Sequence, residues 1–152
     1  MKVHFVVNAV IFNEDKVLLV NENNGGWMLP GGHIEENEVP DQAIFREVKE
    51  ELGSDATFID FPQLFSYGEN AYSNHNVSST FTHIVNRDGG LDERHINYGL
   101  VYIMNLTNEV KPMENQKTKW ITISHIDTSD IVDAVKDIIN NAVKQRDLIL
   151  KD

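Results

Sequence analysis

The chain has 152 residues, enough for one domain with a sizeable core but not for two. Acidic residues (24) outnumber Lys and Arg (13), and the formal net charge of -11 argues against general nucleic-acid binding. No cysteine is present, which excludes disulfides, thiolate metal sites and a catalytic thiol, and favours a cytoplasmic protein. The acidity also disfavours an anionic substrate, unless bound cations supply positive charge.

Two apolar, β-branched segments open the chain at residues 3–12 and 16–22, and they predict a β-hairpin. The first segment is interrupted by Asn8 and is too short to cross a bilayer. We therefore expect a core strand there and no membrane association. A turn at 23–26 and a short extended piece at 27–32 follow.

A helix is predicted over residues 40–52. Pro40 suits the first helical turn, and Gly53 is a natural stop after the last one. Val39 is a poor N-cap, because it has no side-chain acceptor for the first free N–H groups. We therefore expect packing to hold the start of this helix.

The remaining elements are predicted from apolar periodicity. They are a strand over 56–66 interrupted at Pro62, a strand near 78–85, strands over 95–106 and 120–126, and a final helix over 129–147. Strands before, between and after two helices indicate the α+β class, with a mixed sheet between the helices as an α/β/α sandwich. No linker divides the chain, so we expect a single domain over residues 1–152.

One face of the 40–52 helix is acidic. Glu47, Glu50 and Glu51 follow the i, i+3, i+4 spacing, whereas Lys49 points away from them. Neighbouring like charges cost about 0.2–0.5 kcal/mol per pair, so a bound divalent cation explains the cluster well. A solvated acidic helix face is the alternative. The adjacent apolar face, expected to pack on the sheet, consists of Ile44, Phe45, Val48 and Leu52.

The residues around this face follow a longer pattern. Two glycines precede the helix and permit close backbone approach, and Arg46 could form a bidentate pair with Glu38 or with a cluster carboxylate. The spacing resembles the Nudix box, G-x5-E-x7-R-E-U-x-E-E-x-G-U, where U is a bulky apolar residue. The matching positions of this chain, within residues 32–53, are Gly32, Glu38, Arg46, Glu47, Val48, Glu50, Glu51 and Gly53.

The chain is similar to Nudix (MutT-like) hydrolases beyond the box as well. Trp27-Met28-Leu29-Pro30-Gly31-Gly32 is a usual lead-in of the family, and the strand with Trp120 and the last helix come in the family's order. The only departure in the box is its final position, where Ser54 replaces an apolar residue. That position serves packing in the family, so the departure concerns how the chain leaves the helix.

The resemblance implies a metal-dependent pyrophosphohydrolase that cleaves a phosphoanhydride bond in a nucleoside diphosphate linked to another moiety, X. It implies Mg²⁺ or Mn²⁺ bound by Glu47, Glu50 and Glu51 with the Gly32 carbonyl, and Glu50 or Glu51 as the group that activates water. Glu38 and Arg46 correspond to the pair that orients the helix. Glu114, before the tryptophan strand, is a candidate further ligand or base, and an exposed loop acid is the alternative for it.

Outside the box, His95 and Tyr72 are candidate substrate contacts, although a strand-end histidine and an ordinary loop aromatic are the simpler interpretations. Nothing after residue 54 identifies X, so the expected ligand is a small nucleotide derivative. The resemblance also implies a possible homodimer. The alternative function is a Nudix-fold sensor that binds a nucleotide without cleaving it; such proteins usually lose box glutamates, and this chain keeps them all.

Overall fold

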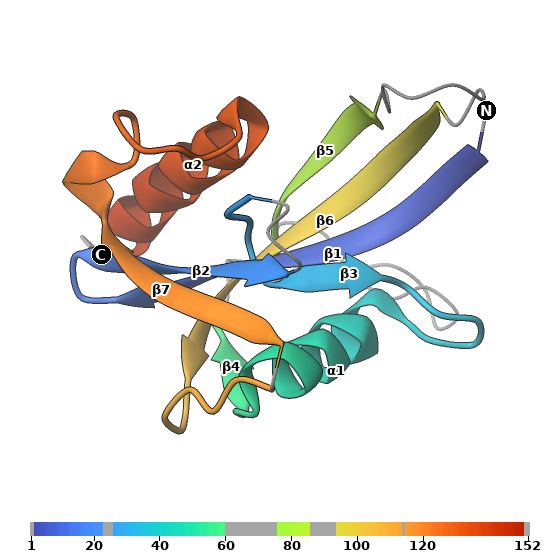
Figure 1. The fold of residues 1–152 in the computed structure, drawn as a ribbon, viewed down its shortest axis with the longest axis horizontal. Coiled ribbons are helices and arrows are strands. Elements are labelled where there is room, and N and C mark those ends of the chain that lie inside the picture. Colours follow the sequence, from blue (N-terminus) through green and yellow to red (C-terminus); the bar gives the residue numbers. More distant parts are fainter. Residues whose placement is uncertain (1, 23–25, 60–75, 86–93, 114, 151–152) are drawn as a thin grey trace.

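The computed structural model describes residues 2–22, 26–59, 76–85, 94–113 and 115–150, and all structural statements concern these. The elements (Figure 1) are, in order, β1 (Lys2–Asn13), β2 (Lys16–Glu22), β3 (Gly31–His33), α1 (Pro40–Leu52), β4 (Ala56–Phe58), β5 (Val77–Val85), β6 (His95–Leu106), β7 (Gln116–Thr122), the short 3-10 helix η1 (Ile123–His125) and α2 (Asp133–Leu150). Within the described chain, no helix is both long and apolar enough to cross a membrane.

The sheet is mixed, as predicted. Its strand order is β4-β6-β1-β2-β7, with β3 also on β1 and β5 also on β6. β1 and β6 run parallel, from Lys2 opposite His95 to Ile11 opposite Met104, and the other strand pairs are antiparallel. β1 pairs with β3 at residues 6–8 and with β2 only at residues 12–13. The sheet therefore opens between β3 and β2, and this opening positions the site described below.

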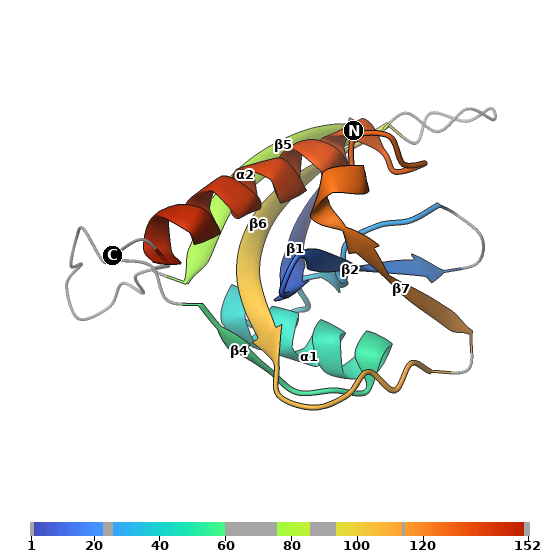
Figure 2. The same ribbon diagram turned by 90° about the vertical axis from the view of Figure 1, so that its left-hand side faces the viewer.

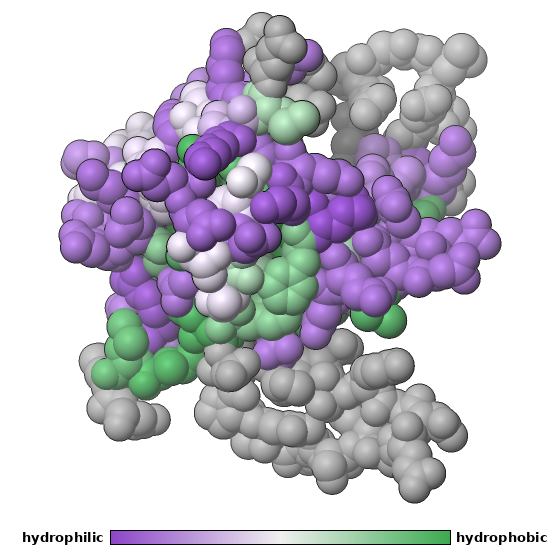
Figure 3. Space-filling view, turned by 90° about the horizontal axis from the view of Figure 1, so that it is seen from below, coloured by the Kyte–Doolittle hydropathy of each residue, from purple (hydrophilic) through white to green (hydrophobic). Residues whose placement is uncertain are grey.

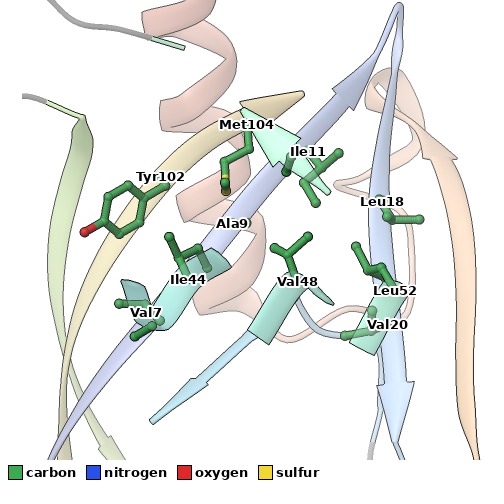
Figure 4. Packing of buried hydrophobic residues seen from close by; sticks show 12 residues of the cluster. Val7, Ala9, Ile11, Leu18, Val20, Ile44, Val48, Leu52, Tyr102 and Met104 are labelled. Atoms are coloured by element: carbon green, nitrogen blue, oxygen red, sulfur yellow. The ribbon is translucent and has the colours of Figure 1, made fainter. Parts of the chain in front are cut away.

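The two helices cover opposite faces of the sheet, with α2 above and α1 below in Figure 2. Alternate residues of β1 point to the two faces: Val7, Ala9 and Ile11 pack with α1, and Val10 and Phe12 pack with α2. Figure 4 shows the first set against three buried residues of α1, namely Ile44, Val48 and Leu52. The predicted α/β/α sandwich is confirmed.

The outer surface on the α1 side is mainly hydrophilic, with smaller apolar areas (Figure 3). Phe45 departs from the prediction that it packs on the sheet, because it is 40% exposed. It follows Ile44 by about 100° around the helix and so lies on the flank of the buried stripe. Its ring packs instead against Phe58 of β4, with 4.6 Å between ring centroids.

Several predicted boundaries were wrong. The strand predicted at 120–126 runs from Gln116 to Thr122, because all seven residues pair with β2 and the chain then turns into η1. The last helix begins at Asp133 rather than 129, since Ile131 still makes an extended bridge to Trp27. Of the strand predicted at 56–66, the structure describes Ala56–Phe58, and residues 60–66 lie outside the described ranges.

The start of α1 is held by hydrogen bonds and not by packing alone, which corrects the expectation for Val39. The Val39 N–H donates to Oε1 of Gln42 (3.1 Å), which is half of a capping box. Within the first turn of the helix, the buried Tyr102 hydroxyl donates to Oδ1 of Asp41 (2.8 Å). Burial, and next the Asp41 carboxylate, raises the pKa of Tyr102, so this donor stays protonated. These bonds fix the helix that carries the acidic residues.

Candidate active site

Two glycines bring β3 into close contact with β1 and α1. Gly31 has φ +152°, and a Cβ there would lie 2.0 Å from the Val7 carbonyl oxygen. A Cβ on Gly32 would lie 2.3 Å from Oε1 of Glu47, far inside van der Waals contact. Only glycine therefore lets the Glu47 carboxylate lie directly against the backbone of β3.

Arg46 links the helix, the loop before it and β3. Its Nε and Nη2 donate to the two oxygens of Glu38 (2.7 and 3.0 Å), and Nη1 donates to Oε1 of Glu47 (2.9 Å). Nη2 also donates to the carbonyl oxygen of His33 (2.9 Å). The hydrogen bonds from Arg46 lower the pKa of Glu38, and Glu38 in turn raises the pKa of Arg46. The bidentate pair expected for Arg46 is therefore present with Glu38.

The three clustered glutamates differ in exposure. The Glu47 side chain is 14% exposed, and burial raises its pKa despite the opposing contact with Arg46. Glu50 is 61% exposed and lies 3.3 Å from Nη1 of Arg46. The Gly31 N–H points at both oxygens of Glu51, at 3.4 Å each. Lys49 pairs with Asp55 on the other side of the helix (3.3 Å), as its predicted direction requires.

The donor set suits a hard divalent cation. Carboxylates of Glu47 and Glu51 both reach the Gly31–Gly32 backbone, which has no side chain to keep them away. In the described ranges, no three His, Asp or Glu side chains stand ready to hold an ion. Because Arg46 engages Glu47 and Glu50, these side chains must rotate to share one ion. The carboxylate donors therefore suit a hard cation such as Mg²⁺ in chemistry, although they do not surround one point.

A pocket of about 320 Å³ opens beside the glutamates, on the α2 side of the sheet. Glu51, Gly31 and Gly32 are among the residues that line it. The other walls come from β1, β5, β6 and the start of α2, and include Val6, Asn8, Phe81, Asn97 and Val135. Glu51 thus belongs to the acidic cluster on the α1 side of the sheet and also lines the pocket on the α2 side. The opening between β3 and β2 connects the two sides.

Sequence reasoning did not identify this pocket. A signal was present, because Asn8 and Asn97 interrupt apolar strands at positions that face the α2 side. The β5 residues were less accessible to prediction, since their strand pairs only with β6 and its position depends on the long-range register Phe81–Gly99.

The predicted residues outside the box have different outcomes. His95 is not among the described residues that line the pocket but lies against His4 of β1, with 4.9 Å between ring centroids, and its predicted substrate contact stays a prediction. The pKa of His4 is lowered, first by desolvation and then by the neighbouring imidazoles of His33 and His95. Glu114 and Tyr72 lie outside the described residues, so their predicted roles stay predictions.

Ser54, the departure from the box pattern, is fully buried after the end of α1. Its hydroxyl donates to the carbonyl oxygen of Asn108 (2.9 Å). At the preceding residue, Gly53 adopts a left-handed conformation with φ +61° and lies against the carbonyl of Lys111. A hydrogen bond to the segment after β6 therefore takes the place of the apolar contact that the pattern provides.

Comparison with known proteins agrees with this geometry. The family model described as "NUDIX domain" matches residues 2–137. An 8-oxo-dGTP diphosphatase of Proteus vulgaris is 34% identical over 61 residues, covering 37% of this chain and 54% of the relative. A CTP pyrophosphohydrolase of Escherichia coli is 40% identical over 62 residues, covering 38% and 46%. The matches thus span only about half the length of these relatives.

Solved structures match along nearly the whole chain. A hydrolase of the NUDIX family from Clostridium perfringens superposes with a TM-score of 0.69 at 26% identity, covering 93% of this chain and 97% of the other. A MutT protein from Methanosarcina mazei superposes with a TM-score of 0.66 at 21% identity, covering 95% and 96%, and shows the same fold. With the box side chains placed together and the family model matching over residues 2–137, the chain belongs to the NUDIX domain family.

Proposed function

We propose that this protein is a metal-dependent hydrolase that cleaves a phosphoanhydride bond in a nucleoside diphosphate linked to another moiety, X. The observation that carries the proposal is the position of Glu51. It shares a helix face with Glu47 and Glu50 and also lines the pocket. A substrate whose organic part fills the pocket would extend its diphosphate towards these carboxylates.

Glu47, Glu50 and Glu51, with the Gly32 carbonyl, are the residues that would hold Mg²⁺ or Mn²⁺. When bound, the cation supplies the positive charge that offsets the diphosphate and lowers the pKa of a coordinated water. Glu50 or Glu51 then accepts a proton from the water whose oxygen bonds to phosphorus, while the bridging P–O bond breaks. Arg46 and Glu38 act as positioning residues, because their contacts with His33 and Glu47 fix α1 against β3.

The identity of X is not decided by the relatives. Their names include an 8-oxo-dGTP diphosphatase, a CTP pyrophosphohydrolase and an ADP-ribose pyrophosphatase, which share a diphosphate but differ in the attached group. Most of the pocket surface is apolar, which suits a flat organic group, and Asn8, Asn97 and Gln116 add hydrogen-bonding side chains. We propose a small nucleotide derivative as substrate.

The test is turnover on a panel of nucleoside triphosphates, oxidised nucleotides, nucleotide sugars, ADP-ribose, dinucleotides and capped RNA, with Mg²⁺ or Mn²⁺. We expect release of a phosphate-containing product from at least one of them, and loss of that release when the metal is chelated. Binding of a panel member without turnover under any of these conditions would instead support the nucleotide sensor.

A further inference from the structure

Three histidine side chains that the proposed hydrolysis does not use lie together at the end of the sheet near the N-terminus. They come from three adjacent strands: His4 from β1, His33 from β3 and His95 from β6. Figure 1 shows this end of the sheet, near the N-terminus and beyond α2. We call His4, His33 and His95 the histidine cluster.

The strand register places all three side chains on one face. His33 of β3 lies opposite Val6 of β1, two residues after His4. His95 of β6 lies opposite Lys2 of β1, two residues before His4. Since side chains alternate along a strand, Lys2, His4 and Val6 share a face with their partners. β1 is the middle strand, so His4 lies between the other two imidazoles.

The rings are close enough to share a ligand. Nδ1 of His4 and Nε2 of His33 form a hydrogen bond of 2.9 Å, which a shared cation would replace, and the His4 ring centroid is 4.9 Å from those of both His33 and His95. Two nitrogens bound to one tetrahedral Zn²⁺ at about 2.0–2.1 Å would lie roughly 3.3 Å apart. The His4–His33 pair is within a few tenths of an ångström of that separation.

We infer that the histidine cluster is a binding site for a late first-row divalent cation such as Zn²⁺, separate from the acidic site on α1. Imidazole nitrogen suits such ions, whereas Mg²⁺ is bound by oxygen donors. The three rings do not yet surround one point, since no ready three-residue metal group occurs in the described chain. As for the box carboxylates, side-chain rotation would complete the site, and strands at 4.7–4.9 Å spacing allow it.

The site would bridge β1, β3 and β6 next to the box. The His33 carbonyl oxygen accepts a hydrogen bond from Arg46 (2.9 Å), and Gly32 precedes it in the chain. A cation held by the His33 imidazole would therefore fix the end of β3, to which Arg46 is bonded. This inference concerns imidazole groups that have no part in the proposed hydrolysis, and it does not depend on that hydrolysis.

The experiment is calorimetric titration of Zn²⁺ into untagged, metal-free protein in excess Mg²⁺. We expect about one equivalent bound by the wild-type protein and at least tenfold weaker binding by His4→Ala and His95→Ala. His125→Ala, which removes an exposed histidine of η1 outside the cluster, should bind as the wild type does. Circular dichroism confirms that each variant is folded, and His4→Asn is a milder substitute if His4→Ala is not.

A second measurement separates the two sites. Co²⁺ bound to imidazole nitrogen should give visible absorption that is retained in the Glu47→Gln/Glu51→Gln double variant and lost in His4→Ala. Zn²⁺ binding that persists in the cluster variants but disappears in the double glutamate variant would overturn the inference, as would wild-type protein that binds no Zn²⁺ in excess Mg²⁺. Neither result would bear on hydrolysis by the box.

Discussion

The acidic end of α1 and the pocket beside α2 meet at Glu51, but their side chains are held in different ways. Around α1, charged groups fix one another, and Arg46 alone contacts Glu38, Glu47, Glu50 and the His33 carbonyl. Around the pocket, mainly neutral side chains from several strands and α2 pack without such bonds, and Phe81 and Val135 are examples.

The difference indicates that the acidic end of α1 serves the reaction and that the pocket beside α2 serves the choice of substrate. The charged network depends on a few residues with fixed geometry, so a change there affects every substrate. The pocket wall depends on shape, so a change there affects some substrates more than others. The following variants test that division, from the largest expected effect to the smallest.

Glu51→Gln should lower kcat by roughly 10²-fold or more, the scale expected for loss of a general base, on every substrate that is turned over. The substitution keeps the shape of the side chain, so the melting temperature should change little. Steady-state kinetics on the best substrate measures the effect. Glu36→Gln, at an exposed box position outside the fixed pattern, is the matched control. Near-normal kcat in Glu51→Gln would remove Glu51 from the mechanism.

Arg46→Ala should destabilise the fold by about 2–3 kcal/mol, because the Arg46 side chain is only 22% exposed and two poorly exposed carboxylates lose their partner. Chemical denaturation measures the free energy of unfolding. Lys49→Ala removes a cation from the exposed side of the same helix and should change stability by less than about 0.5 kcal/mol. Equal effects of the two variants would show that the Arg46 network does not stabilise the helix.

Phe81→Ala should raise KM roughly tenfold for substrates with a bulky organic group, since burying a phenyl ring is worth about 1.5–3 kcal/mol when complete. The kcat and the Mg²⁺ requirement should stay close to wild type. Phe5→Ala, at a ring that is 59% exposed and outside the pocket, is the control. A loss of kcat without a change in KM would mean that pocket and acidic cluster are not separable.

Ser54→Ala should cost about 1 kcal/mol of stability, since the carbonyl of Asn108 loses the donor of a buried hydrogen bond. No kinetic constant should change. Ser124→Ala, at an exposed serine of η1, controls for the loss of a hydroxyl. Altered metal dependence in Ser54→Ala would contradict the conclusion that this position serves only the exit from α1.

Sequence predicted the acidic site well because its residues lie within one short segment. Helical periodicity alone placed Glu47, Glu50 and Glu51 together and turned Lys49 away, and the structure agrees. The order of strands and helices was also readable, since each long apolar segment forms one element. The predicted start of the last helix was wrong because Ile131 forms a bridge to Trp27, so the helix begins after it. Pairing with a residue so distant in sequence leaves no local signal.

The pocket and the histidine cluster were missed for the same reason. His4 and His95 are brought together only by the parallel pairing of β1 with β6, which no local pattern specifies. Asn97 and Phe81 face one cavity only once β5 is in register with β6. Sequence patterns therefore predicted which residues meet within one helix, but not which residues meet through the pairing of strands that are distant in sequence.

The parallel pair of β1 and β6 also affects the order in which the chain can fold. Lys2 pairs with His95, about 90 residues later, so β1 leaves the ribosome long before its main partner. At roughly 5–20 residues per second, the apolar strand waits several seconds with one edge unpaired. Folding of the central sheet is therefore a late event with high contact order, and the nascent first strand is the segment most exposed to aggregation.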